Sequence, residues 1–126
     1  MSGKSMPQKS LPRNSPEQGD IVLVEFSYSD LKRSKFRPAL VISRSRYNVS
    51  SLDVVVLRIT SKPQRVWAIK ITNNDLETGF LEVVSYVKID SLYTVEQKMV
   101  AKIVATLNTA KLAEVKLMLR ELFDLG

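Results

Sequence analysis

Between residues 19 and 89 the chain repeats short apolar runs of strand length, separated by polar segments. β-Branched and aromatic residues fill these runs, as is typical of strands. The run at 53–59 starts apolar on both faces, which predicts a central strand. About five closely spaced strands predict a small, strongly curved antiparallel sheet or barrel. The runs are residues 21–26, 36–43, 53–59, 66–71 and 80–89, the last as one bent strand or two short ones.

The last third of the chain has helical patterns instead. Thr94 to Gln97 fits a capping box with Thr94 as the N-cap, and apolar residues then follow at helical spacing as far as Leu107. Asn108 interrupts this pattern and can cap a second helix, whose apolar stripe lies within residues 112–122. We therefore expect two C-terminal helices, with apolar stripes that pack in the core or against a partner.

The chain divides into an N-terminal extension and one domain. Residues 1–18 are rich in Ser, Pro, Lys and Gln without apolar periodicity, which predicts a disordered, basic N-terminal extension. Residues 19–126 are then the one domain expected at this length.

Residues 73–75, Asn-Asn-Asp, are a turn signal. Pro38 cannot donate to a strand ladder, so it belongs at the start of its strand or on an edge.

Residues that the chain lacks exclude several function classes. There is no cysteine and no histidine, so disulfides, thiolate metal sites and the commonest general acid–base are absent. No P-loop, dinucleotide-binding glycine pattern or metal-ligand spacing occurs, and we expect no metal or other cofactor. No apolar run approaches the roughly 18–20 residues that span a membrane, and no signal-peptide core is present, so we expect a cytoplasmic protein without a membrane partner.

Positive charge is concentrated in one part of the chain. The formal net charge is +6, and residues 30–48 hold six basic residues against one acidic residue. Residues 49–126 have a net charge of only +1. This concentration indicates an anionic partner such as a nucleic acid or an acidic protein tail, and a solvated loop is the alternative. The six basic residues are Lys32, Arg33, Lys35, Arg37, Arg44 and Arg46.

Two of the expected strands carry a polar group where an apolar one is typical. Arg37 opens the second strand, and Thr60 closes the third. If these strands are neighbours, both side chains can face one phosphate, which an arginine binds bidentately. Such a pair suits cleavage of RNA by its own 2′-hydroxyl, where stabilising the phosphoryl charge is usually the largest effect. A snorkelling edge arginine and a turn-forming threonine are the alternative interpretation.

Cleavage also requires proton transfer and base contacts. Asp30 and Glu25 are the carboxylates nearest to Arg37 in the sequence, so they are the candidates for proton transfer. The basic residues of segment 30–48 would line an RNA groove. Three aromatic residues can stack on unpaired bases or pack in the protein: Tyr28, Tyr47 and Trp67.

The order and spacing of these segments resemble the PemK/MazF family of small toxin endoribonucleases. The likeness extends more weakly to about residue 124. The Arg-Pro and Ile-Thr-Ser elements are fairly specific in combination and weak alone. The matching segments are Gly-Asp-Ile-Val-x-Val at 19–24, Arg-Pro-Ala-Leu-Val-Ile-Ser at 37–43, Tyr47-Asn48, Arg-Ile-Thr-Ser at 58–61 and Lys88-Ile89-Asp90.

The resemblance implies a mainly β fold with C-terminal helices, a small SH3-like β-barrel of the CcdB/PemK type, usually as a homodimer. It implies metal-independent cleavage of single-stranded RNA to 2′,3′-cyclic phosphate and 5′-hydroxyl ends, and neutralisation by an acidic antitoxin. By similarity, Arg37 stabilises the phosphate with Thr60 as its partner, and the loop 27–35 is a mobile flap. Further RNA contacts expected on this basis are Ser61, Tyr86 and Lys88.

The chain departs from the family pattern in two places. Ser85 and Tyr86 stand where many members have an acidic residue followed by Gln, and residues 30–33 replace a Glu-Gln of the flap. Both departures bear on the proton-transfer groups and on the preferred RNA sequence. They leave open a second hypothesis, in which the same fold binds protein or nucleic acid without catalysis, as a gyrase poison or a partner-dependent repressor.

Overall fold

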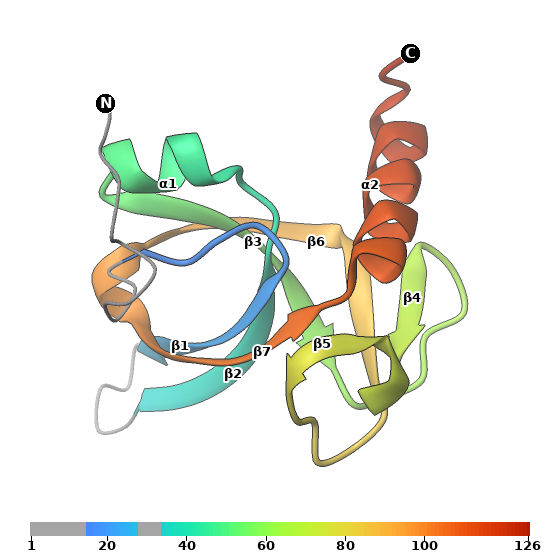
Figure 1. Ribbon diagram of the computed structural model, residues 1–126, viewed down its shortest axis with the longest axis horizontal. Coiled ribbons are helices and arrows are strands. Elements are labelled where there is room, and N and C mark those ends of the chain that lie inside the picture. The colour runs from blue at the N-terminus through green and yellow to red at the C-terminus, as the bar shows by residue number, and fades with distance from the viewer. Residues whose placement is uncertain (1–14, 28–33) are drawn as a thin grey trace.

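Seven strands in the described part of the chain form one antiparallel sheet that curls into a half-barrel, and a C-terminal helix covers part of it (Figure 1). The computed structural model describes residues 15–27 and 34–126. The prediction of a mainly β fold of this type is confirmed. Along the sheet the strands lie in the order β4-β6-β3-β2-β1-β7-β5. Their bounds are β1 Asp20–Ser27, β2 Ser34–Val41, β3 Asp53–Thr60, β4 Ala68–Ile71, β5 Leu76–Gly79, β6 Ser85–Glu96 and β7 Val100–Leu107. The helical elements are α1 Ser45–Ser50, the 3₁₀ turns η2 Asn73–Asp75 and η3 Gln97–Met99, and α2 Thr109–Phe123.

Apolar residues are buried on both faces of the sheet. Neighbouring residues of a strand point to opposite faces, so β1, β2 and β3 supply residues to both cores. This two-sided burial explains the continuous apolar run of β3, which lies between β2 and β6 as a central strand, as predicted. The core against α2 includes Ile21, Leu40, Leu57, Ile71, Ile89 and Val115. On the opposite face, which we call the second face, the core consists of Val22, Val24, Ala39, Val41, Val54 and Val56.

Pro38 lies where the pairing of β2 with β3 stops. The Ile42 amide donates to the Val55 carbonyl oxygen at 2.9 Å. The backbone N–H groups of every second residue in a strand point toward the same neighbouring strand, so an N–H at position 38 would also point toward β3. Proline has no N–H to donate. Accordingly β2 pairs with β3 only from Ala39 to Val41, whereas it pairs with β1 along nearly its whole length. The first half of β2 is thus locally an edge, as predicted for a strand proline.

The prediction of a helix over residues 94–107 is wrong, because this segment holds the end of β6, the turn η3 and the strand β7. The register of β7 against β1 shifts at two points. Each such bulge adds one residue without a partner and breaks the strict alternation of a strand. The core-facing residues of β7 are therefore Val100 and Ile103 on the second face and Val104, Ala105 and Leu107 on the face toward α2. Positions 100, 103, 104 and 107 together imitate the spacing of a helix.

The last predicted helix is confirmed as α2. The Asn108 side chain accepts the backbone N–H of Lys111 at 2.8 Å and caps the helix. The fully buried Val115 centres its apolar side on the core. The turn at 73–75 is also confirmed, as a 3₁₀ turn closed by a capping box between Thr72 and Asp75. In the described residues, the helices are all too short or too polar to cross a membrane.

Three short segments differ from the sequence prediction. Residues 80–84 are an irregular loop and not a strand, because no neighbouring strand pairs with them, and Phe80 is exposed. The helix α1 and the strand β5 were not predicted. In β5, Gly79 has φ +87°, and a Cβ there would lie 2.3 Å from the Val104 carbonyl oxygen, so glycine allows β5 to approach β7 this closely.

A buried polar network ties α1 to the sheet. Asn48 is 1% exposed, and its amide donates to the carbonyl oxygens of Pro16 at 2.9 Å and Ser43 at 3.0 Å. The Ser43 hydroxyl donates to Asn48 Oδ1 at 2.5 Å. Gln97, predicted to cap a helix, instead donates to the Asn48 backbone carbonyl oxygen at 2.6 Å. Pro16 thus contacts the domain, while residues 1–14 of the expected extension lie outside the described residues.

Replacing Asn48 by alanine should lower the free energy of unfolding by about 1–3 kcal/mol, because the buried groups that it bonds lose their partners. Urea denaturation measures this change. Val49→Ala, on the same helix but at a side chain that is 72% exposed, should change the stability by less than about 0.5 kcal/mol. Equal effects of the two substitutions would contradict a stabilising role for the network.

Candidate functional site

The sheet register aligns Arg37 with Thr60. Ala39 pairs with Arg58 and Val41 with Val56, and continuing this register by two residues places Arg37 opposite Thr60. Both positions continue the alternation of residues that face the second face. The expectation that the two strands are neighbours is confirmed. Because pairing stops at Ala39, Arg37 and Thr60 lie on the second face where β2 and β3 separate.

A pocket of about 240 Å³ opens beside this separation. Two guanidinium groups and two aromatic rings surround a floor that includes small apolar side chains. The residues come from four neighbouring strands, β1, β2, β3 and β6, so the curled sheet itself makes the pocket. The lining residues are Phe26, Arg37, Pro38, Ala39, Val56, Arg58 and Tyr93.

The two arginines of the pocket have no anionic partner within residues 15–27 and 34–126. Both are exposed, and the ion pairs in this part of the chain involve other cations, Lys98 and Lys111. Arg37 and Arg58 come from neighbouring strands and line the same pocket. Two unpaired cations this close repel one another and favour an anion between them. The geometry therefore suits a phosphate group.

Sequence reasoning singled out Arg37 but missed Arg58 and Tyr93. Arg58 is the only charged residue inside the apolar run 53–59 after its first residue. A cation in the middle of an otherwise buried central strand was the signal for a polar site on that strand. Tyr93 had no such signal, because it lies between the last predicted strand, which ends at residue 89, and the predicted helix cap at Thr94.

The hydroxyl of Thr60 has a structural role that leaves its proton free. Thr60 Oγ1 accepts the backbone N–H of Lys62 at 3.1 Å and so shapes the turn after β3. A hydroxyl that accepts one hydrogen bond can still donate its own proton. Turn formation and a contact to a ligand oxygen are therefore compatible at this residue.

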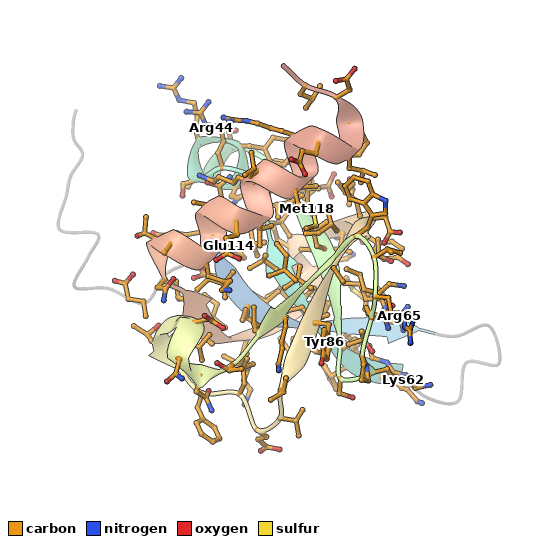
Figure 2. The ribbon with its side chains drawn as sticks, turned by 90° about the vertical axis from the view of Figure 1, so that its right-hand side faces the viewer. Arg44, Lys62, Arg65, Tyr86, Glu114 and Met118 are labelled. Atoms are coloured by element: carbon orange, nitrogen blue, oxygen red, sulfur yellow. The ribbon has the colours of Figure 1, made fainter. Side chains whose placement is uncertain are left out.

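Two more expected contacts extend the site across the sheet. Thr60 pairs with Tyr86 of β6, and Tyr86 pairs with Lys70 of β4. Lys88, two residues after Tyr86, shares its face. In Figure 2, Tyr86 is drawn on the same side of the molecule as Lys62 and Arg65. The second face thus bears a polar, cationic strip next to the pocket.

The other predicted site residues differ in where they lie relative to Arg37 and Thr60. Glu25 lies between Val24 and Phe26 on β1, so its side chain points to the face opposite to Arg37. Lys35 shares the face of Arg37, and Ser61 directly follows Thr60; both are exposed. The predicted residues Tyr28, Asp30, Lys32 and Arg33 lie outside the described residues.

Arg44 and Arg46 belong to the α1 end of the molecule. Arg44 precedes the first residue of α1 and Arg46 lies within it, between the end of β2 and the start of β3. Arg37 and Thr60 lie toward the opposite ends of these two strands. Figure 2 shows Arg44 far from Tyr86. The structure therefore does not bring this pair of arginines to the pocket.

Comparison with known proteins identifies the family of this fold. The family model of PemK-like, MazF-like toxins of type II toxin–antitoxin systems matches residues 17–123. The chain belongs to this family. A MazE–MazF complex from Deinococcus radiodurans superposes with a TM-score of 0.74 at 22% identity, over 88% of this chain and 98% of that chain. No curated protein matches the sequence.

Two mycobacterial structures share the PemK-like, MazF-like fold. An endoribonuclease in complex with its cognate antitoxin, from a mycobacterial species, gives a TM-score of 0.73 at 18% identity, over 88% of this chain and 97% of that chain. The Mycobacterium tuberculosis toxin MazF-mt6 gives 0.69 at 18% identity, over 85% and 98%. Among the residues described for this family member, no cluster of three or more acidic side chains is placed to hold a metal ion.

Because Arg58 has no ion pair among the described residues, Arg58→Gln should not lower the free energy of unfolding by more than about 0.5 kcal/mol. Lys111→Gln is the matched charge removal. Lys111 lies 3.6 Å from Asp75 and 3.2 Å from Glu114, so its loss should cost up to about 1 kcal/mol. Inorganic phosphate should raise the Tm of the unmodified protein more than that of Arg58→Gln. A larger loss of stability for Arg58→Gln than for Lys111→Gln would contradict an unpaired cation.

Proposed function

We propose that this chain is the toxin of a type II toxin–antitoxin system and cleaves single-stranded RNA. The observation that supports this most directly is that Arg37 and Arg58 lie on one face beside Thr60 and have no ion pair among the described residues. Membership of the PemK-like, MazF-like family supports it as well. Proteins of the same fold include mycobacterial endoribonucleases.

The proposed reaction uses the RNA as its own nucleophile. The 2′-oxygen forms a bond to phosphorus while the bond from phosphorus to the 5′-oxygen breaks, which leaves a 2′,3′-cyclic phosphate and a 5′-hydroxyl. Arg37 stabilises the charge on the non-bridging oxygens, and the Thr60 hydroxyl donates to one of them or positions the 2′-hydroxyl. Charge stabilisation of this kind typically contributes most to the rate.

Proton transfer completes the balance: one proton leaves the 2′-hydroxyl and one reaches the departing 5′-oxygen. Glu25 faces the other side of the sheet, so Asp30 is the remaining carboxylate candidate for accepting the first proton. Arg37 is the candidate donor for the second. Additional RNA contacts are proposed along the cationic strip, from Lys35, Ser61, Tyr86 and Lys88.

An acidic antitoxin is the proposed partner, since an acidic segment would neutralise the cations that bind RNA. Structures of the same fold include complexes with antitoxin, among them the Deinococcus radiodurans MazE–MazF complex. We place both proteins in the cytoplasm, where the RNA substrate is found. Exposed apolar side chains outside the pocket support a homodimer; they include Leu52, Val66, Phe80, Leu117 and Phe123.

Light scattering at micromolar concentration tests the homodimer. A mass twice that of one chain is expected, because self-association would remove exposed apolar side chains from water. A monomeric mass that persists as the concentration rises would contradict the dimer, whatever the result of RNA cleavage.

Incubation with long single-stranded RNA in a chelator tests the activity, with Arg37→Ala as the key variant. Discrete cuts with cyclic phosphate ends are expected, and Arg37→Ala should reduce the rate by about 10²–10³-fold, as expected for loss of one charge-stabilising donor. Thr60→Val should also slow cleavage. Arg46→Ala, which removes the same charge on α1, is the control and should cleave like the unmodified protein.

Intact RNA in the presence of folded, unmodified protein would reject the endoribonuclease and favour the non-catalytic binding role. If Arg37→Ala and Arg46→Ala cleave RNA equally well, the role assigned to Arg37 is wrong, but the protein is still an endoribonuclease.

A further inference from the structure

We propose that the pocket is a nucleotide subsite next to the cleaved phosphate, where Tyr93 stacks on a base and Arg58 binds the adjoining phosphate. This inference deepens the proposed function and depends on it. The subsite would determine how the RNA is held, while Arg37 and Thr60 act on the reacting groups.

The aromatic ring of Tyr93 is exposed at the pocket and not buried in the core of the sheet. It comes from the C-terminal part of the long strand β6 and pairs with Val56, so its ring lies on the second face. It is nevertheless 45% exposed and lines the pocket. Phe26 of β1 also lines it. Nucleic-acid bases stack on such rings whatever their identity, because each base has an aromatic face.

Arg58 provides the charge for the same ligand. It pairs with Ala39 across the strands, and this small side chain leaves room above the pocket floor. An arginine fork binds a phosphate through two parallel hydrogen bonds and also stacks on flat rings. Since Arg58 has no ion pair among the described residues, no internal contact has to break when a phosphate binds.

The size of the pocket limits what occupies it. Its volume of about 240 Å³ lies below the roughly 300–1,000 Å³ of pockets that enclose a whole small molecule. Arg37 and Arg58 line the same pocket from neighbouring strands, so two side chains that can bind phosphate lie at one site. The arrangement fits one nucleotide of a longer chain whose next phosphate is held by Arg37.

The test measures binding separately from cleavage. The probe is a fluorescently labelled single-stranded RNA of randomised sequence, 2′-O-methylated throughout so that it has no attacking hydroxyl. By fluorescence polarisation, Tyr93→Ala and Arg58→Gln should each raise the Kd roughly 5- to 100-fold, as expected for one lost stacking or phosphate contact. Tyr93→Phe keeps the ring and should bind almost like the unmodified protein.

Leu92→Ala is the matched control for Tyr93→Ala. Leu92 is 42% exposed, adjacent in β6, and pairs with Leu57, so it faces the opposite side of the sheet. If Tyr93→Ala binds like Leu92→Ala, the subsite is wrong. The same holds if Tyr93→Phe loses as much affinity as Tyr93→Ala.

Cleavage of unmodified RNA, measured in parallel, separates this inference from the proposed function. Binding that depends on Tyr93 without any cleavage by the unmodified protein would support the subsite and reject the endoribonuclease. Cleavage that proceeds while binding is insensitive to Tyr93 and Arg58 would reject the subsite alone. A folded, unmodified protein that neither binds the probe nor cleaves RNA would overturn both.

Discussion

The backbone register of β2 against β3 is the constraint on which the candidate site depends. It sets Arg37 opposite Thr60 and Ala39 opposite Arg58, and it stops where Pro38 has no amide hydrogen to donate. A residue with an amide at this position would allow the ladder to continue toward Ile59. The separation of the strands, and with it the mouth of the pocket, therefore follows from one missing hydrogen-bond donor in the middle of β2.

Burial on both faces of the sheet limits where charge can lie. Val22, Val54 and Val56 fill the second face at the α1 end of these strands, where a cation would be desolvated without a partner. At the other end the core thins out and β3 reaches solvent, so Arg58 and Thr60 can stand on the same face as the valines. Along these strands the second face is therefore apolar and buried toward α1, and polar and more exposed from Arg58 to Thr60.

Secondary structure was predicted correctly where the spacing of apolar residues in the sequence matched the residues that are buried in the structure. Strands β1 to β4 were found because each is short and bounded by polar segments, and α2 was found from its cap at Asn108 and its apolar spacing. The segment of β7 was misread because two bulges give its inward residues a helix-like spacing. A bulge is defined by the register of β7 against its partner strand β1, and the spacing of residues within β7 alone does not contain that register.

The candidate site was predicted only in part for a similar reason. Arg37 and Thr60 were chosen because each is polar in an apolar run. Tyr93 lies at the same pocket because it pairs across the sheet with Val56, which is 37 residues away in the chain. The side chain of Glu25 points to the other face, because Val24 and Phe26 on either side of it face the pocket side. Proximity in sequence thus favoured a carboxylate that faces the other side of the sheet, and it gave no signal for Tyr93, which lines the pocket.

The shortness of the two edge strands of the sheet limits how another protein molecule could bind to this one. β4 and β5 are each four residues long, and each pairs on only one side. Short edges offer few open backbone groups for adding a strand from another molecule. Assembly with a second copy or a partner would therefore be encoded in side chains that can change one at a time, and not in the backbone hydrogen bonds that all copies share.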